Sequence, residues 1–365
     1  MPLRSRYSRI NTLQKNIKPV FSLQISNFVK KKFLLSKCST YICSGSCSIM
    51  IGYCCIARYG TSFFYAYRFL FVDAILAITN LLETYCTFTT DLNWHCYQSM
   101  YEFHSDKKRY FQWQCDVSKN WVIPFIELDG HIDQNSKVLE IGCGEAGVLK
   151  AFLDLGCEGV GIELNENRVE LANHFLADEI NRGQARIISS NIYDIDPIKD
   201  AHQYDLIILK DVIEHIFDQK KFLKKLGQFL LPGGRVFFGF PPWQMPFGGH
   251  QQICSNKVLK VTPYFHLLPK SIYRSILKMT KERPGQLQEL MEIKETGISI
   301  EKFESMVGNT GFDISLYQHF LINPIYEKKF GLKPRKQLWP IYKIPYLRNY
   351  LTTAVYYLIK QNSTL

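Results

Sequence analysis

The sequence has 365 residues, of which 46% are hydrophobic, 21% charged and 14% aromatic, and its formal net charge is +11. This composition is typical of a globular protein and excludes a collagen, a coiled coil and a wholly disordered chain. Residues 1–99 carry a balance of +8, which leaves only +3 for residues 100–365. A nucleic-acid partner is therefore not expected for the larger part of the chain.

Residues 1–99 have no clear helical or strand periodicity and hold seven of the 11 cysteines. No paired C-x-x-C with a histidine pair completes a zinc site there, so no metal is expected. Residues 38–57 are uncharged but too rich in Ser, Thr and Gly for a spanning helix, and a membrane anchor is only the alternative. Since ordinary protein sequence follows Met100, we expect residues 1–99 to be a poorly structured or mispredicted extension.

The four later cysteines (Cys115, Cys143, Cys157 and Cys254) have no framework spacing. They are expected to be free thiols, which predicts a reducing, cytoplasmic location.

Apolar runs and helical patterns alternate from residue 106 onward. The pattern predicts a helix over 106–127 and helices that begin after Gly147, Asn165 and Asp218. Strands are expected at 138–141, 159–163, 185–189, 204–209 and 235–240. Such alternation predicts a parallel sheet with helices on both faces and a ligand beyond the carboxyl ends of the strands. Further along, a helix capped by Ser299 and strands at 314–321 and 351–359 are expected.

A glycine turn follows the first strand in the run KVLEIGCGEAG. Gly142, Gly144 and Gly147 match G-x-G-x-x-G, and Glu163 follows Gly142 by 21 residues. Alone, this pattern is a dinucleotide fingerprint, which keeps an NAD-dependent oxidoreductase as an alternative. Glu140, however, places a carboxylate where it would repel a pyrophosphate. It favours a phosphate-free ligand with an ammonium and a sulfonium, namely S-adenosylmethionine.

Four runs, VLEIGCGEAG, GIELN, YDLIILKDVIEHI and LLPGGRVFF, resemble the class I S-adenosylmethionine-dependent methyltransferases. The resemblance is strongest to the broad group that includes the ubiquinone-biosynthesis O-methyltransferases, and it covers about residues 105–325. It implies a Rossmann-like, seven-stranded, mostly parallel α/β sheet with an antiparallel C-terminal strand. A single methyltransferase domain would then occupy residues 100–365.

The resemblance also assigns residues to the cofactor. Glu140, Gly142 and Gly144 would lie at its methionine end, and Glu163 would bind the ribose hydroxyls, at a position where an acid has little evident structural role. The remaining assignments are Asn191 at the adenine amine, Ile192 at the adenine edge, and Lys210 with Asp211 beside the methionine.

Two insertions, at about 241–291 and 322–350, are expected to lie over the methyl donor and form the acceptor side. The second contains a basic run, which is expected to be a solvated loop face, with contact to an anionic substrate or membrane surface as the alternative. The run comprises Lys328, Lys329, Lys333, Arg335 and Lys336.

Methyl transfer from a sulfonium needs alignment and exclusion of water, and an oxygen acceptor also needs its proton removed. His250 and His215 are the candidates for this base. The expected acceptor is a small molecule or a lipid or glycan intermediate, with oxygen preferred over nitrogen or carbon. A non-catalytic S-adenosylmethionine-binding protein is a further alternative. Nucleic acid and membrane contact are not expected, and the sequence does not indicate an oligomeric state.

Overall fold

The computed structural model describes residues 106–196 and 203–362, which all belong to one compact unit. The expectations for residues 1–99 lie outside the described residues. None of the helices in the described ranges has the length and apolar character needed to cross a membrane. The four cysteines of this part of the chain are free thiols, as expected.

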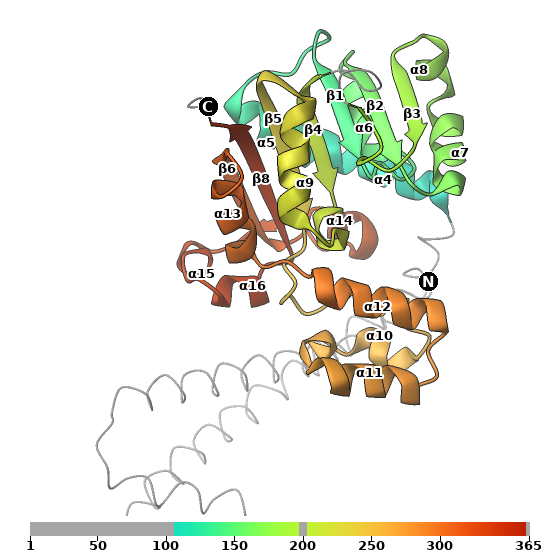
Figure 1. The fold of residues 1–365 in the computed structure, drawn as a ribbon, viewed down its shortest axis with the longest axis vertical. Coiled ribbons are helices and arrows are strands. Elements are labelled where there is room, and N and C mark those ends of the chain that lie inside the picture. The colour runs from blue at the N-terminus through green and yellow to red at the C-terminus, as the bar shows by residue number, and fades with distance from the viewer. Residues whose placement is uncertain (1–105, 197–202, 363–365) are drawn as a thin grey trace, which may run out of the picture. The chain divides into compact units, whose positions relative to one another are not determined.

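An eight-stranded sheet forms the centre of the fold, in the order β3-β2-β1-β4-β5-β8-β6-β7 (Figure 1). Strands β1 to β5 are parallel, and β8 lies antiparallel between β5 and β6. The bounds are β1 Lys137–Ile141, β2 Glu158–Glu163, β3 Ala185–Ser189, β4 Tyr204–Lys210, β5 Leu230–Phe240, β6 Phe312–Ile322, β7 Arg335–Lys336 and β8 Ala354–Gln361. The expected α/β class is confirmed, with an eighth strand of two residues, β7, added at the edge beside β6.

Helices cover both faces of the sheet because neighbouring strand residues point to opposite sides. Val138 and Ile208 contribute to a core under α4 (Lys107–Val117), α5 (Ile123–Ile126) and α6 (Gly147–Leu153). Leu139 and Leu209 contribute to the opposite core, under α9 (Gln219–Leu226) and α13 (Ile300–Gly308). The strands are therefore apolar on both sides, as their sequences suggested.

The predicted helix starts are confirmed by their caps, since the side chains of Asp106, Asn165, Asp218 and Ser299 each accept a bond from a first-turn amide. Several boundaries differ from the expectation. Strand β5 begins at Leu230 instead of 235, and β6 spans Phe312–Ile322 instead of 314–321. The helix after Asn165 breaks at Leu176 into α7 (Glu166–Phe175) and α8 (Ala177–Asn181). The last strand begins at Ala354, because residues 351–353 still form the turn that follows α16 (Leu347–Tyr350).

Both insertions are helical and lie near the end of the sheet where the parallel strands finish (Figure 1). The first contains α10 (Lys257–Val261), α11 (Lys270–Met279) and α12 (Pro284–Thr296), packed around a small core of its own. The second contains α14 (Ile325–Phe330), β7, α15 (Trp339–Tyr342) and α16. The structure therefore gives defined helices to two segments for which the sequence analysis gave no bounds of helices.

Candidate functional site

The glycine turn after β1 has the tight geometry that its sequence predicts. Gly142 and Gly144 both have positive φ, 69° and 56°, in the left-handed region that favours glycine. A Cβ at Gly142 would come within 2.7 Å of a Val212 methyl group, whereas at Gly144 it would meet only the Arg168 side chain, at 3.7 Å. Gly142 is therefore required by packing as well as by backbone conformation, and Gly144 leaves open space for a ligand.

Glu140 lies in β1, and its side chain reaches the N-terminus of α6. Its carboxyl group is 3% exposed, and Oε2 accepts a 2.8 Å hydrogen bond from the Leu149 amide in the first turn of that helix. Burial raises the pKa of Glu140 to about 8, with a further contribution from Glu163, although the Leu149 bond and Lys210 act in the opposite direction. The carboxyl group uses one first-turn amide of α6 and lies where its ionised form would repel a pyrophosphate.

Glu163, at the end of β2, is held by backbone amides. Oε2 accepts from Gly144 at 2.8 Å, and Oε1 accepts from Leu164 and Asn165 at 2.9 Å each. The expectation that an acid here has little structural role is wrong, because this carboxylate ties the glycine turn to the turn after β2. Its assignment to the ribose hydroxyls stays a prediction of the resemblance.

Lys210 and Asp211 meet a helix that the sequence analysis did not include in the site. The Lys210 ammonium donates to Gln114 Oε1 of α4 and to Asp211 Oδ2, at 2.9 Å each. Burial lowers the pKa of Lys210, but Asp211 together with Tyr110 and Tyr356 outweighs burial, so the pKa is raised. The pKa of Asp211 is lowered, because Lys210 outweighs the effect of burial with help from Lys329 and His250. The hydroxyl oxygen of Tyr110, one turn before Gln114, accepts a hydrogen bond from the side-chain amide of Gln114.

The third glycine of the motif explains how α4 reaches this position. A Cβ on Gly147 would lie 2.5 Å from the Phe111 carbonyl oxygen and 2.8 Å from Gln114 Cβ. The missing side chain lets α4 pack closely against α6. The four-residue spacing of Tyr110 and Gln114 was the only sequence signal for this face, and it did not indicate what the face would contact.

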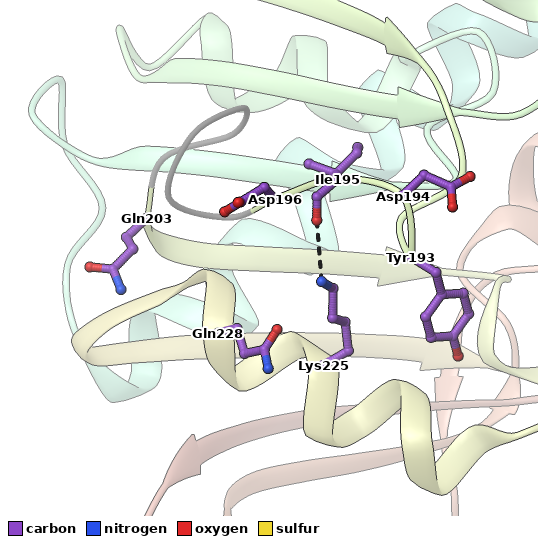
Figure 2. Close-up of a pocket in the computed structure, with 7 residues that line it drawn as sticks. All are labelled: Tyr193, Asp194, Ile195, Asp196, Gln203, Lys225 and Gln228. Carbon is purple, nitrogen blue, oxygen red and sulfur yellow. Dashed lines mark hydrogen bonds between the residues drawn. The ribbon is translucent and has the colours of Figure 1, made fainter.

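Asn191 and Ile192 lie in the loop after β3. The Asn191 side-chain oxygen accepts a bond from the Tyr193 amide at 3.1 Å, and Ile192 is 6% exposed in the core. A pocket of about 680 Å³ lies beside this loop, between Tyr193, Ile195 and Lys225 of α9 (Figure 2). None of the predicted cofactor residues lines it.

His215 and His250, which come from different loops, are brought together by the structure. Their ring centroids are 5.0 Å apart. Glu214 lies beside them, 4% exposed, with neither carboxyl oxygen hydrogen-bonded within the described residues. Burial, together with Asp211, raises the pKa of Glu214. The ligand atoms of these three side chains lie within 4.8 Å of one another, a geometry that could hold a metal ion, although no metal ligand was predicted.

His250 lies in a closely packed loop. Its own φ is 53°, and a Cβ on the preceding Gly249 would lie 2.1 Å from His266 Cβ. His266 Nε2 donates to the Trp243 carbonyl at 2.7 Å behind that loop. Burial lowers the pKa of His250 to about 4, helped by neighbouring His215 and opposed by Asp211. The pKa of His215 is also lowered by burial. Both rings are therefore neutral at pH 7.

The second insertion also reaches the site, through α14. Lys329 is half-buried, with its ammonium 5.5 Å from the centre of the Tyr110 ring, and burial lowers its pKa against the opposing effect of Asp211. Lys328 forms an ion pair with Asp116 at 2.8 Å. The expectation of a solvated loop face is thus wrong for Lys329, whereas Lys328 is exposed on the helix α14.

The fold and this glycine turn define a class of protein. Residues 114–250 match the family model described as a methyltransferase domain. Together with the sheet order, the match makes this part of the chain a class I methyltransferase domain of the S-adenosylmethionine-dependent kind.

Curated relatives share this region. The ubiquinone biosynthesis O-methyltransferase of Coxiella burnetii is 29% identical over 103 residues, which are 28% of this chain and 42% of that protein. The enzyme of the same name from Mesorhizobium japonicum is 31% identical over 102 residues, which are 28% of this chain and 39% of the relative. The chain therefore spans less than half the length of these relatives.

Solved structures with a similar arrangement include a putative sarcosine dimethylglycine methyltransferase from Galdieria sulphuraria. Its TM-score is 0.43 at 13% identity, with 67% of this chain and 85% of that chain covered. Another is geranyl diphosphate C-methyltransferase from Streptomyces coelicolor, with a TM-score of 0.41, 13% identity, and 65% and 78% of the two chains covered.

Proposed function

We propose that this protein transfers the methyl group of S-adenosylmethionine to a small-molecule, lipid or glycan-intermediate acceptor, at a hydroxyl oxygen. The observation that carries the choice of cofactor is Glu140. Its carboxyl group accepts the Leu149 amide at the N-terminus of α6, beside the position that the pyrophosphate of a dinucleotide would need, and its ionised form would repel that group. A ligand with an ammonium and a sulfonium gains from the same carboxyl group, so the NAD alternative is disfavoured.

The remaining cofactor contacts follow the turn and the strand ends. Gly144 offers open space beside the turn, and Glu163 at the end of β2 would receive the ribose hydroxyls. Asn191 and Ile192 would face the adenine, although the Asn191 oxygen already accepts a local amide. Lys210 and Asp211, with Gln114 behind them, would line the methionine side.

His250 is the proposed general base, with His215 beside it. Methyl transfer is an in-line displacement in which the acceptor oxygen attacks the methyl carbon and the sulfonium leaves as a thioether. A neutral imidazole can take the hydroxyl proton as the new bond forms, and both histidines are neutral at pH 7. The names of the matched relatives support an oxygen acceptor.

Calorimetric titration of the full chain with S-adenosylmethionine and with NAD tests the proposal. We expect micromolar-range binding of the methyl donor and no binding of NAD. Glu163→Gln should weaken donor binding at least roughly tenfold, the loss of about one hydrogen bond to a charged group. Glu166→Gln, an exposed acid three residues further on, serves as the matched control and should bind as the wild type does. Binding of NAD without binding of the donor would refute the assignment.

The acceptor is best found with methyl-labelled donor and fractionated cell extract. Label should move to a fraction that loses it when His250 is replaced by Gln. Label transferred equally well by His250→Gln would remove the proposed base while leaving the transferase assignment intact.

A further inference from the structure

The second insertion displays a group of large apolar side chains to solvent. Trp339 is 68% exposed, Tyr346 71% and Leu338 59%. Ile344, Leu347 and Tyr350 add smaller exposed areas in the same segment. Single exposed apolar residues are ordinary on a protein surface, but six within 13 residues of chain form a patch, and such patches mark interaction sites.

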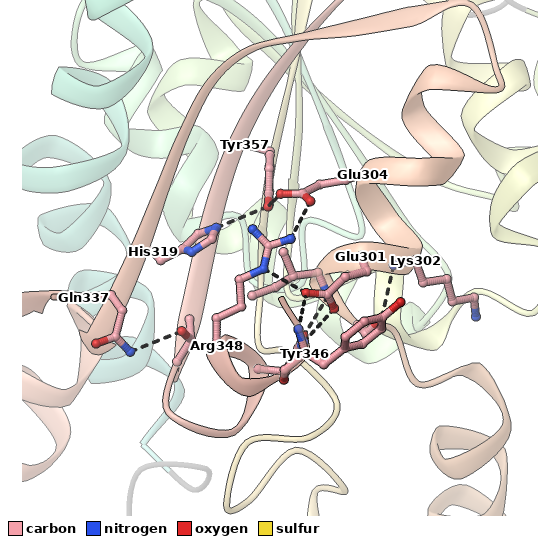
Figure 3. A network of polar contacts seen from close by, with 12 residues as sticks. Glu301, Lys302, Glu304, His319, Gln337, Tyr346, Arg348 and Tyr357 are labelled. Atoms are coloured by element: carbon pink, nitrogen blue, oxygen red, sulfur yellow. Dashed lines mark hydrogen bonds and ion pairs between the residues drawn. The ribbon is translucent and has the colours of Figure 1, made fainter. Parts of the chain in front are cut away.

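A half-buried polar network holds this segment in place (Figure 3). The Arg348 side chain, 12% exposed, binds Glu301 of α13 at 2.8 Å and also pairs with Glu304. The Asn349 side chain accepts from the Ile300 amide at 2.8 Å and donates to Glu301 at 2.6 Å. The apolar side chains are therefore displayed by a segment that is anchored by half-buried ion pairs and by the buried Asn349 side chain.

The segment that carries the patch contains basic but no acidic residues, although Glu301 and Glu304 of α13 pair with its Arg348. Residues 328–362 contain eight Lys and Arg residues and no acidic residue, whereas residues 101–240 contain 22 acidic and 16 basic residues. Four of the eight are exposed and form no ion pair with any other described residue, namely Lys333, Arg335, Lys336 and Lys343. The net charge of residues 100–365 is thus near neutral because a basic segment, residues 328–362, offsets an acidic one, residues 101–240. The exposed basic residues complement an anionic partner.

The residue types favour a lipid surface over other anionic partners. Trp and Tyr are preferred at the boundary between lipid and water, and Lys and Arg bind the headgroups of anionic lipids. Leu338 and Ile344 offer a nucleic acid neither hydrogen bonds nor aromatic stacking, but they can enter the acyl region beside Trp339. The absence of a spanning helix from the described residues is compatible with attachment from one side.

A second segment near the same end of the sheet has the same character (Figure 1). Residues 241–283 contain seven basic residues and one acidic residue, Glu282, which is buried and accepts amide bonds from Ser255 and Asn256. Met279 of α11 is 79% exposed and Val258 of α10 is 68% exposed. Both insertions therefore add positive charge and exposed apolar area on the acceptor side.

From these observations we propose that residues 331–350 dock the domain on an anionic lipid bilayer, with Trp339 and Tyr346 entering the interface. The sequence analysis gave contact of the basic run with an anionic substrate or membrane surface only as the alternative, because the sequence does not indicate which apolar residues of this segment are exposed. The proposal concerns attachment and is independent of the proposed methyl transfer.

Vesicle binding by the full chain provides the test. Large unilamellar vesicles of phosphatidylcholine alone are compared with vesicles containing about 30% phosphatidylglycerol, by sedimentation and by tryptophan fluorescence with brominated lipid as quencher. We expect binding only to the anionic vesicles, a blue shift and quenching that disappear in Trp339→Phe, and weakening by salt. Binding without quenching at Trp339 would place attachment elsewhere in the chain and overturn the proposal.

Two double variants separate the apolar from the electrostatic contribution. K333E/K336E should lower the partition coefficient roughly thirtyfold, since each basic residue near an anionic surface contributes on the order of 1 kcal/mol. W339S/Y346S should lower it at least roughly tenfold through lost apolar burial. The matched controls, L128S and K137E/K224E, change residues that are also exposed but lie outside both insertions, and should bind as the wild type does.

Oligomeric state is measured on the same samples. If W339S/Y346S converts an oligomer to a monomer while vesicles fail to bind the wild type, the patch is an interface between copies of the chain and the proposal is overturned. Unchanged circular dichroism and unchanged donor binding in the double variants would exclude misfolding as the cause of lost attachment.

Discussion

Glu140→Gln offers a prediction in which stability and ligand binding move in opposite directions. The buried carboxyl of Glu140 has a pKa of about 8 in the fold, against 4.5 for the unperturbed group. Between these two values the folded state holds a proton that the unfolded chain has lost, so wild-type stability falls as the pH rises. Glutamine cannot ionise and retains an oxygen acceptor for the Leu149 amide.

The magnitude follows from the shift. Each pH unit between about 4.5 and 8 changes the free energy of unfolding of the wild type by about 1.4 kcal/mol relative to the variant. Across the whole window the difference should therefore move in favour of Glu140→Gln by up to about 5 kcal/mol, whatever constant offset the amide group introduces. Above about pH 8 the difference should become constant.

Urea unfolding of both proteins between pH 5 and pH 9 measures this difference. The affinity of the wild type for S-adenosylmethionine should rise with pH up to about 8, because the cationic ligand favours the ionised carboxylate. Glu140→Gln should bind the donor more weakly and without that pH dependence. A stability difference that stays flat from pH 5 to pH 9 would refute the idea of a buried neutral carboxyl group.

Three further perturbations test other parts of the site. Gly142→Ala should lower the free energy of unfolding by at least about 2 kcal/mol and abolish donor binding, because it combines a positive φ with a 2.7 Å clash. Gly183→Ala has a positive φ but no atom within 4 Å of the new Cβ, and should lower it by only about 1 kcal/mol. Thermal unfolding compares the two variants, and equal losses of stability would contradict the packing argument. His250→Gln should lower kcat by roughly 10²-fold or more and leave the Kd of the donor unchanged. Gly249→Ala should also lower kcat, because the new Cβ displaces the loop that carries His250. A changed Kd with a normal kcat would contradict the role of His250 as the base. Arg348→Met should lower the free energy of unfolding by about 1–2 kcal/mol, because the two ion pairs that it removes are half-buried. Faster hydrogen exchange limited to residues 337–350 would locate the loss in the anchored segment, whereas unchanged exchange there would contradict its role.

The central part of the fold could be predicted because its local signals agree. Apolar runs, glycine turns and caps such as Asn165 and Asp218 all indicate strands alternating with helices, and the structure confirms them. The capping bonds depend on residues within three positions of one another, which is why they are readable. The two-residue strand β7 was not predictable, because Arg335 and Lys336 lack strand propensity and join the sheet only through pairing with β6.

Predictions for the site were limited by contacts between distant residues. The proximity of His215 and His250 depends on how two loops fold over the sheet, and their separation in sequence gives no measure of it. Gln114 and Lys329 reach Lys210 and Tyr110 from α4 and α14, which no local pattern relates. Glu163 was identified from its spacing, but its three amide bonds depend on where the glycine turn lies in space.

The close approach of α4 to α6 at Gly147 has a practical consequence for expressing the domain. The matched methyltransferase region starts at residue 114, in the middle of α4, whereas that helix starts at Lys107 and is capped by Asp106. A truncation at residue 114 would delete Tyr110 and the Lys107–Glu145 ion pair and leave Gln114 on a frayed end. A recombinant fragment should therefore begin upstream of Asp106. If a shorter fragment failed to bind a nucleoside ligand, the loss would reflect the truncated helix α4 and not an inactive protein.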